Sequence, residues 1–305
     1  MSTTLHQQLD ACIEACKQAS GINFFVLLEE PLANFYRTIE EGDIAEAAKS
    51  ADVFLFALQK LVHFELHEET GETMLAILES HSRVPELASI HRQLSVSYDM
   101  NKRFAESERH FNAAIAAVAP AAEAGSIEDI KMIASLWHNR AQYARNGETN
   151  LELKEYNAKA LWWYESINDN RGIVLCLNRL CSLLEESQVH ERMAINKRIL
   201  EIGKAEKDDG MILVAQMNLG YSEVEMGNSE YGLKLIRNSI ARIEKDSSWR
   251  YIALAHLHLA EALAVSKQKE EAAKELHYAT ALFHNHGVAI YDEKINSVAA
   301  KVEAL

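Results

Sequence analysis

The feature that most constrains the fold is an internal repeat of about forty residues. Five segments, starting at residues 88, 134, 174, 213 and 253, share one order of large and small side chains. In four of them position 7 is leucine and position 8 is small, as in Leu219-Gly220 and Leu259-Ala260. The residue before each segment is leucine or isoleucine. A repeat of this length predicts structural units that bury their apolar faces only by stacking on neighbours.

The scarcity of proline and glycine predicts that these units are helical. The chain has only 3 prolines and 12 glycines. Inside a helix a proline lowers stability by about 3 kcal/mol and a glycine by about 1 kcal/mol relative to alanine. Within each segment the large apolar residues recur at the i, i+3, i+4, i+7 spacing of one helix face. We therefore expect an all-α protein in which each unit is a pair of antiparallel helices that approach closely at the small residue.

One unit carries a family resemblance. Asn218-Leu219-Gly220, followed by Gly227 and by Glu230-Tyr231-Gly232, resembles the tetratricopeptide repeat, whose first helix carries Asn-Leu-Gly before a Gly-Asp-Tyr turn. The resemblance covers roughly residues 88–286 and implies a right-handed superhelical solenoid of antiparallel helix pairs. Arg140 departs from it, because the other four repeats have leucine there. We expect Arg140 to reach solvent or to pair with an acid.

The two ends are helical by pattern. Residues 1–87 are expected to form an N-terminal helical cap, in which 28–61 are a candidate degenerate repeat. Asp43 suits a helix N-cap with Glu46 three residues later, and the helix that it opens is predicted to run to about His67. Residues 287–305 should contain an amphipathic helix with a stripe of Ile295, Val298, Val302 and Leu305.

This C-terminal helix needs a surface to cover. Seven apolar residues of the last two repeats are predicted on one inner face: Val214, Met217, Val224, Leu254, Leu257, Ala264 and Val265. Because such a lining is seldom left open to water, we expect the C-terminal helix to cover it, within one chain or across a homodimer. The alternative is that the helix follows the fifth repeat as a further first helix.

Charge and hydropathy exclude two classes of partner. The formal net charge is -14, with 45 acidic and 31 basic residues, so binding to nucleic acid is disfavoured. No run approaches the roughly 20 apolar residues of a membrane helix, and the first residues lack the pattern of a signal peptide. We expect a cytoplasmic protein.

Few residues offer chemistry. His63 and His67 lie at i and i+4, but a metalloprotease helix has glutamate directly after the first histidine, where this chain has Phe64. Cys12 and Cys16, like Cys176 and Cys181, are expected to be reduced thiols. No phosphate-binding loop or nucleophile–base pair is apparent. We predict no catalytic residue, no metal and no cofactor; a metal-dependent helical enzyme built on His63 and His67 is the alternative.

The resemblance also implies a binding groove, lined by positions 2, 5, 9, 12 and 13 of each first helix. Carried over to this chain, it gives ten candidate peptide-binding residues: Arg92, Asp99, His138, Gln142, Arg145, Asn146, Asn178, Ser182, Met217 and Tyr221. Guanidinium and amide groups at these positions could hydrogen-bond an extended peptide or its carboxylates. The plain alternative is that solvated polar residues line any groove.

The groove positions argue against one known class of ligand. The clamp that holds chaperone tails has lysine and asparagine at positions 5 and 9 of its first repeat, where this chain has Arg92 and Val96. We therefore predict a module that binds some other protein or peptide. Repeats of about 40 residues resemble those of bacterial signal-transduction proteins, which implies a regulatory or sensor role. A self-associating structural scaffold is the remaining alternative.

Overall fold

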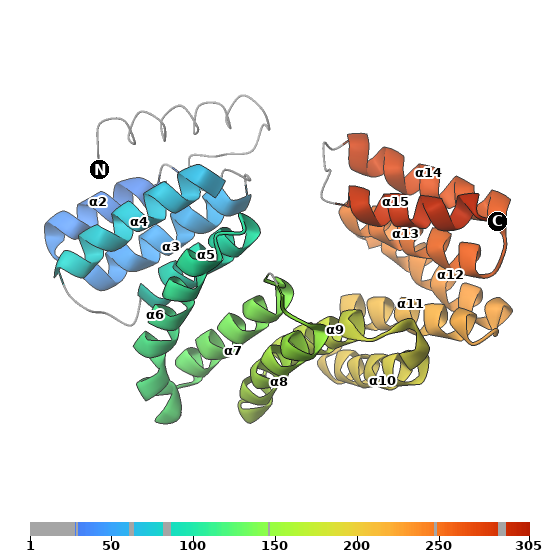
Figure 1. Ribbon diagram of the computed structural model, residues 1–305, viewed down its shortest axis with the longest axis horizontal. Helices are drawn as coiled ribbons and strands as arrows, with labels where there is room; N and C mark the ends of the chain where they lie inside the picture. The colour runs from blue at the N-terminus through green and yellow to red at the C-terminus, as the bar shows by residue number, and fades with distance from the viewer. Residues whose placement is uncertain are drawn as a thin grey trace. The chain divides into compact units, whose positions relative to one another are not determined.

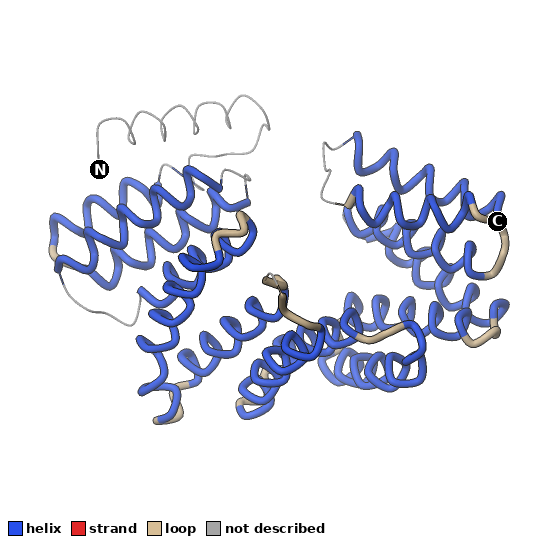
Figure 2. The backbone as a smooth tube through the Cα atoms, in the orientation of Figure 1, coloured by secondary structure: helices blue, strands red, loops and turns tan. Residues whose placement is uncertain are grey.

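The computed structural model describes residue 28 and residues 30–60, 64–81, 87–145, 147–246, 249–285 and 291–305. This described part contains 14 α-helices and no strand (Figure 2). The helices are α2 (Glu30–Glu41), α3 (Ile44–Lys60), α4 (Phe64–His81), α5 (Leu87–Met100), α6 (Phe104–Glu123), α7 (Ile127–Gln142), α8 (Asn150–Ser166), α9 (Asn170–Leu183), α10 (Val189–Glu206), α11 (Asp209–Glu225), α12 (Ser229–Asp246), α13 (Trp249–Val265), α14 (Lys269–Asn285) and α15 (Asp292–Glu303).

Left-handed residues close the short turns between paired helices. Gly227 has φ 90° and Lys267, at the corresponding place, has φ 61°. The Gly227 amide donates to the Val224 carbonyl at 2.9 Å, and the next amide donates to the carbonyl of Glu223. This pair of hydrogen bonds satisfies the last carbonyl groups of a helix. The chain can therefore reverse direction within a few residues, which produces antiparallel pairs.

Each of the five segments predicted as repeats contains most of two consecutive helices, from α5 and α6 to α13 and α14 (Figure 1). The chain divides into two compact units, Met1–Cys176 and Leu177–Leu305. Within the first unit α5 packs on α6 and α7 on α8, and the first helices α3, α5 and α7 pack successively on one another. Within the second, α11 packs on α12, α13 on α14, and α13 on α11. The repeats are longer than the usual tetratricopeptide repeat, and part of this extra length lies in α6, which has 20 residues.

The N-terminal helices differ from the prediction. Asp43 does cap α3, since its carboxylate accepts the Glu46 amide at 3.1 Å. However, α3 ends at Lys60 instead of continuing to His67, and α4 starts at Phe64 and packs back on α3. If α3 had continued to His67, the apolar residues of α4 would have lain beyond the end of α3 instead of packing back against it. The α2/α3 hairpin exists within 28–61, but α3 also stacks on α5 and thus takes the place of a first helix.

Each unit has its own apolar core. In the first, Phe35, Phe54 and Leu58 pack with Met74 and Leu94. In the second, one cluster extends from Leu213 in α11 to Val302 in α15. Gly220 and Gly232 lie where α11 crosses α12: a Cβ added to Gly220 would come within 2.7 Å of the Gly232 carbonyl oxygen. The small residue at position 8 is thus a point of close helix contact.

The C-terminal helix continues the stack. α15 packs on α13 and α14, as α13 packs on α11 and α12. Ile295, Val298 and Val302 are buried in this contact, whereas Leu305 is 45 % exposed. Lys301 Nζ lies 2.7 Å from a carboxylate oxygen of Glu261 in α13. The helix therefore occupies the place of a further first helix, the alternative considered above, instead of lying along α11 and α13.

Candidate binding surface on the first helices

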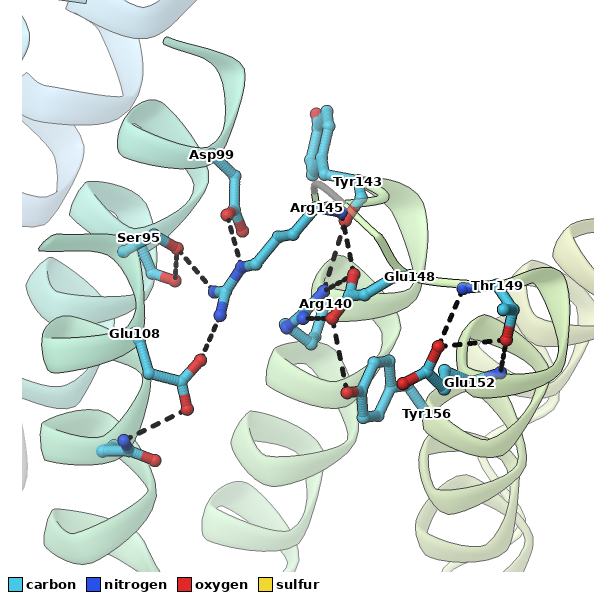
Figure 3. Close-up of polar contacts among 12 residues, drawn as sticks. Ser95, Asp99, Glu108, Arg140, Tyr143, Arg145, Glu148, Thr149, Glu152 and Tyr156 are labelled. Atoms are coloured by element: carbon cyan, nitrogen blue, oxygen red, sulfur yellow. Dashed lines mark hydrogen bonds and ion pairs between the residues drawn. The ribbon is translucent and has the colours of Figure 1, made fainter. Parts of the chain in front are cut away.

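Two of the ten candidate residues meet directly in the first unit. Arg145, in the loop after α7, reaches across to α5, where its Nε lies 3.0 Å from Asp99 Oδ1 (Figure 3). Its guanidinium also donates to Ser107 Oγ at 3.0 Å and pairs with Glu108, both in α6. The Arg145 and Asp99 side chains are only 11 % and 3 % exposed. This guanidinium is therefore satisfied within the protein and ties the second repeat to the first.

The same loop explains why Arg140 departs from the repeat pattern. Arg140 is buried and pairs with Glu148, and its guanidinium carbon lies 4.6 Å from the centre of the Tyr156 ring (Figure 3). Burial alone would raise the pKa of Glu148, but hydrogen bonds from Arg140 and from the Arg145 amide outweigh it, so this pKa is lowered. The prediction that Arg140 pairs with an acid is confirmed. The ion pair holds the loop that carries Arg145.

The other candidates of the first unit have local partners. Arg92 Nη2 donates to Ser89 Oγ at 3.4 Å within α5. His138 and Gln142, one turn apart on α7, are half-buried, with 3.0 Å between their side-chain nitrogens. Asn146 lies outside the described residues. The first helices thus carry polar groups as predicted, but these groups are largely held by one another.

In the second unit the candidates divide between core and surface. Met217 is buried, and its carbonyl lies 3.4 Å from His258 Nε2 of α13. Tyr221 is half-buried against the His258 ring, with 5.2 Å between ring centroids. Ser182 is exposed and bonds within its own helix, and Asn178 is half-buried. Met217 and Tyr221 therefore help to hold α11 on α13.

The expected apolar lining is much smaller than predicted. Met217, Val224, Leu257 and Ala264 are all buried in the core of the second unit. Only Val214 and Val265 are exposed, at 38 % each, and Leu254 is half-buried. The reason is geometric, because stacking of α13 on α11 and of α15 on α13 covers the positions that would otherwise face a groove. The C-terminal helix thus meets this face at α13, as expected, but the seven residues do not form one continuous inner lining that it covers.

A pocket opens instead along the first helices of the first unit. Its volume is about 600 Å³, and residues of α3, α5, α6 and α7 line it. They are Ala48, Lys49, Asp52, Val53, Ser89, Val118, Glu128, Asp129 and Met132. The Asp52 backbone carbonyl accepts the Gln93 amide nitrogen at 2.8 Å, and its carboxylate also accepts from Ser89 and Gln93, which fixes it at the pocket. Three carboxylates and several apolar side chains thus share one depression.

No site for metal chemistry is found in the described part of the chain. No three histidine, cysteine or acidic side chains gather there as metal ligands. His63 lies outside that part, as do Cys12 and Cys16. His67 is fully buried, and burial lowers its pKa to about 4 against a smaller opposing effect of the neighbouring Gln93 side chain. Burial also raises the pKa of the Cys176 thiol to about 12 and that of Cys181 to about 11.

Comparison with known proteins gives relatives by structure only. No family model matches the chain, and no curated protein matches it in sequence. Among the described residues, no helix is long and apolar enough to cross a membrane. The chain does resemble several solved helical-repeat structures, of which three are informative.

The first is aspartyl phosphate phosphatase F from Bacillus subtilis, with 12 % identity, a TM-score of 0.54 and coverage of 88 % of this chain and 77 % of that one. The second is a STAND signal transduction ATPase with a tetratricopeptide-repeat sensor from Pyrococcus horikoshii, with 14 % identity and a TM-score of 0.56. It matches 97 % of this chain, which spans only 49 % of the ATPase. A tetratricopeptide-repeat protein from Parabacteroides merdae gives 12 % identity, a TM-score of 0.50 and coverage of 90 % and 98 %. At these identities the likeness shows the fold alone: the chain has a tetratricopeptide-repeat-type helical fold.

Proposed function

We propose that this chain is a protein- or peptide-binding module with a regulatory or sensor role in bacterial signalling, and that it binds its ligand on the first helices of the first unit. The observation that carries the proposal is the pocket of about 600 Å³ on α3, α5, α6 and α7. Binding sites are typically depressions with apolar walls and a few well-placed polar groups, and this pocket combines both.

The chemistry of the pocket favours a basic ligand. Asp52, Glu128 and Asp129 place three carboxylates around it, against one lysine. The aliphatic stem of a lysine or arginine can lie on Val53 and Met132 while its charged end pairs with these carboxylates. The net charge of -14 would attract such a peptide over a longer range. We therefore infer an extended or helical segment with at least one basic residue.

The signalling context rests on the structural neighbours. One is an aspartyl phosphate phosphatase, and another is a signal transduction ATPase whose repeats form its sensor. Both share a fold of this type with the chain. Their likeness supports a regulatory or sensor role for this chain and gives no information on its partner.

A selection from a displayed library of random peptides tests the proposal. Peptides enriched on the whole protein should be rich in lysine and arginine, and their binding should weaken as salt rises. Glu128→Arg should weaken binding about fivefold or more, because it reverses a charge at the pocket. Glu270→Arg is the matched control, since Glu270 is also an exposed acid in the first turn of its helix. Equal binding to both variants would refute the placement, and no enrichment at all would refute the proposal.

A further inference from the structure

The helix α8 has two apolar faces, and only one of them is used inside the protein. Leu153, Ala160 and Tyr164 are buried as the core face. On the opposite side Leu151 is 66 % exposed and Trp162 is 61 % exposed. A helix of a monomeric protein normally turns a polar face to solvent, so this second apolar face calls for a partner.

Tryptophan is concentrated at this place. The chain has 4 tryptophans, and three of them, Trp137, Trp162 and Trp163, line one shallow pocket of about 440 Å³ together with Glu155, Ala158 and Lys159. The Trp162 and Trp163 rings meet edge to face, 4.6 Å between centroids. The Lys159 ammonium lies 4.2 Å above the Trp137 ring. Aromatic side chains that are already fixed in this way bind with little loss of conformational entropy, and tryptophan is enriched in interface hot spots.

The exposed stripe of α8 is symmetric along the helix. Leu151, Glu155, Ala158 and Trp162 follow one another at intervals of four, three and four residues, so the spacing is the same when the helix is turned end for end. Two antiparallel copies related by a two-fold axis would place the leucine of each stripe on the tryptophan of the other. Ala158, near the middle, has a side chain small enough for the two helices to approach closely.

The charges of the stripe are complementary to themselves. Glu155 and Lys159 are both exposed and lie one turn apart around the middle of the stripe. In the antiparallel arrangement Glu155 of each copy lies opposite Ala158 of the other and one residue from its Lys159, within reach of an ion pair, so two such pairs form across the axis. A parallel arrangement would place these two residues on opposite flanks of the interface, where they could not pair. The complementary charges therefore favour the antiparallel orientation and a second copy of this chain as the partner.

We propose that α8 is a self-association surface, on which a second copy of this chain packs antiparallel through Leu151, Ala158 and Trp162, with Glu155 and Lys159 paired across a two-fold axis. An isologous contact of this kind uses the same patch on both copies. One helix from each copy buries less area than the roughly 1,600 Å² of a standard interface, so we expect a reversible dimer with a dissociation constant of about 1–100 µM. The peptide pocket lies on other helices, and the dimer does not depend on it.

Analytical ultracentrifugation of the whole protein from low to high micromolar concentration tests the dimer. The wild type should change reversibly from monomer to dimer, and Trp162→Glu should remain monomeric over the whole range. Tyr251→Glu is the matched control, since Tyr251 is an equally exposed aromatic residue, at 60 %, on α13; it should dimerise like the wild type. A wild type that stays monomeric throughout would refute the proposal, as would a dimer that Trp162→Glu leaves intact.

Charge reversal tests the orientation. Glu155→Lys and Lys159→Glu should each weaken the dimer about threefold to tenfold at low salt. The doubly reversed protein should dimerise like the wild type, and an equimolar mixture of the two single variants should form heterodimers. If the double variant stayed as weak as the single ones, the antiparallel arrangement would be wrong. Circular dichroism of each variant confirms that the monomer is folded.

Discussion

The sharpest test of the packing is the crossing of α11 and α12. A Cβ on Gly220 would lie 2.7 Å from the Gly232 carbonyl oxygen, 2.8 Å from Ile236 Cγ1 and 3.2 Å from Leu235 Cβ. The nearest of these atoms belongs to the backbone and cannot turn aside. Any larger residue at 220 must therefore push the two helices apart, which disturbs the core between them.

The magnitude follows from two opposed effects. Overpacking of a core costs about 1–3 kcal/mol, whereas replacing a helical glycine by alanine gains about 1 kcal/mol in helix propensity. We expect Gly220→Ala to lose up to about 2 kcal/mol of unfolding free energy. Gly220→Leu adds three more carbon atoms to the same contact, so its loss should lie near about 3 kcal/mol.

Urea unfolding followed by circular dichroism measures this loss, and about 3 kcal/mol should lower the midpoint by about 1 M or more. Gly210→Ala is the control, because Gly210 is exposed in the same helix and its added Cβ would meet only the end of the Asp208 side chain, at 3.2 Å. Because the oxygen at that end caps α11 by accepting the Met211 amide, this variant should lose at most about 1 kcal/mol, well below the loss at Gly220. A Gly220→Leu protein that keeps the wild-type midpoint would refute the close contact and, with it, the alignment of the repeats.

Three further changes test the polar contacts. Arg140→Ala leaves the Glu148 carboxylate without its buried partner and should cost about 3–5 kcal/mol in thermal unfolding, most of which Arg140→Leu combined with Glu148→Gln should restore. The pKa of His67 is about 4 in the folded protein and about 6.5 in the unfolded chain, so the unfolded state binds more protons at pH 5. Acidification from pH 7.5 to 5 should therefore lower the free energy of unfolding by about 2 kcal/mol. A His67→Phe variant should not show this loss. Glu261→Gln weakens the contacts with two lysines of α15 and should speed amide hydrogen exchange in α15 but not in α11, whereas equal exchange in both would show that these ion pairs do not hold α15.

The sequence predicts the helix pairs well because the repeat and the packing have the same physical origin. Leu219 and Gly220 mark a unit since a large residue fills the core where a small one allows two backbones to meet. The N-terminal helices lack this pattern, and the packing of α4 on α3 therefore has no counterpart in the repeats from which it could be predicted. Periodicity also cannot show that Leu257 is buried, because its burial depends on whether another helix stacks on α13.

Contacts between repeated positions follow fixed sequence offsets. His91 meets His110 with 2.8 Å between their Nδ1 atoms, and His256 meets Glu275, in both cases 19 residues later in the chain. Each pair joins the first and second helices of one repeat, and both pairs hold the same two frame positions in their own repeats. Such a contact can be predicted from the repeat alone, even though the side chains differ, because the backbone brings the same two positions together in each unit.

The frame does not predict contacts that depend on the conformation of a loop, even where the two residues hold the same frame position in successive repeats. Arg145 lies beyond the end of α7, and its partner Asp99 is 46 residues away in the preceding repeat. The frame placed both residues in a groove open to a ligand, whereas the loop geometry set by Arg140 and Glu148 turns the guanidinium toward its own protein. The pocket beside Glu128 combines the middle of α3, which lies outside the five repeats, with residues near the start of α5 and α7 and the end of α6. The pocket that we propose as the binding site is therefore formed by residues that the frame does not predict, and Glu128→Arg should change ligand binding without disturbing the stack, unlike substitutions at Arg140.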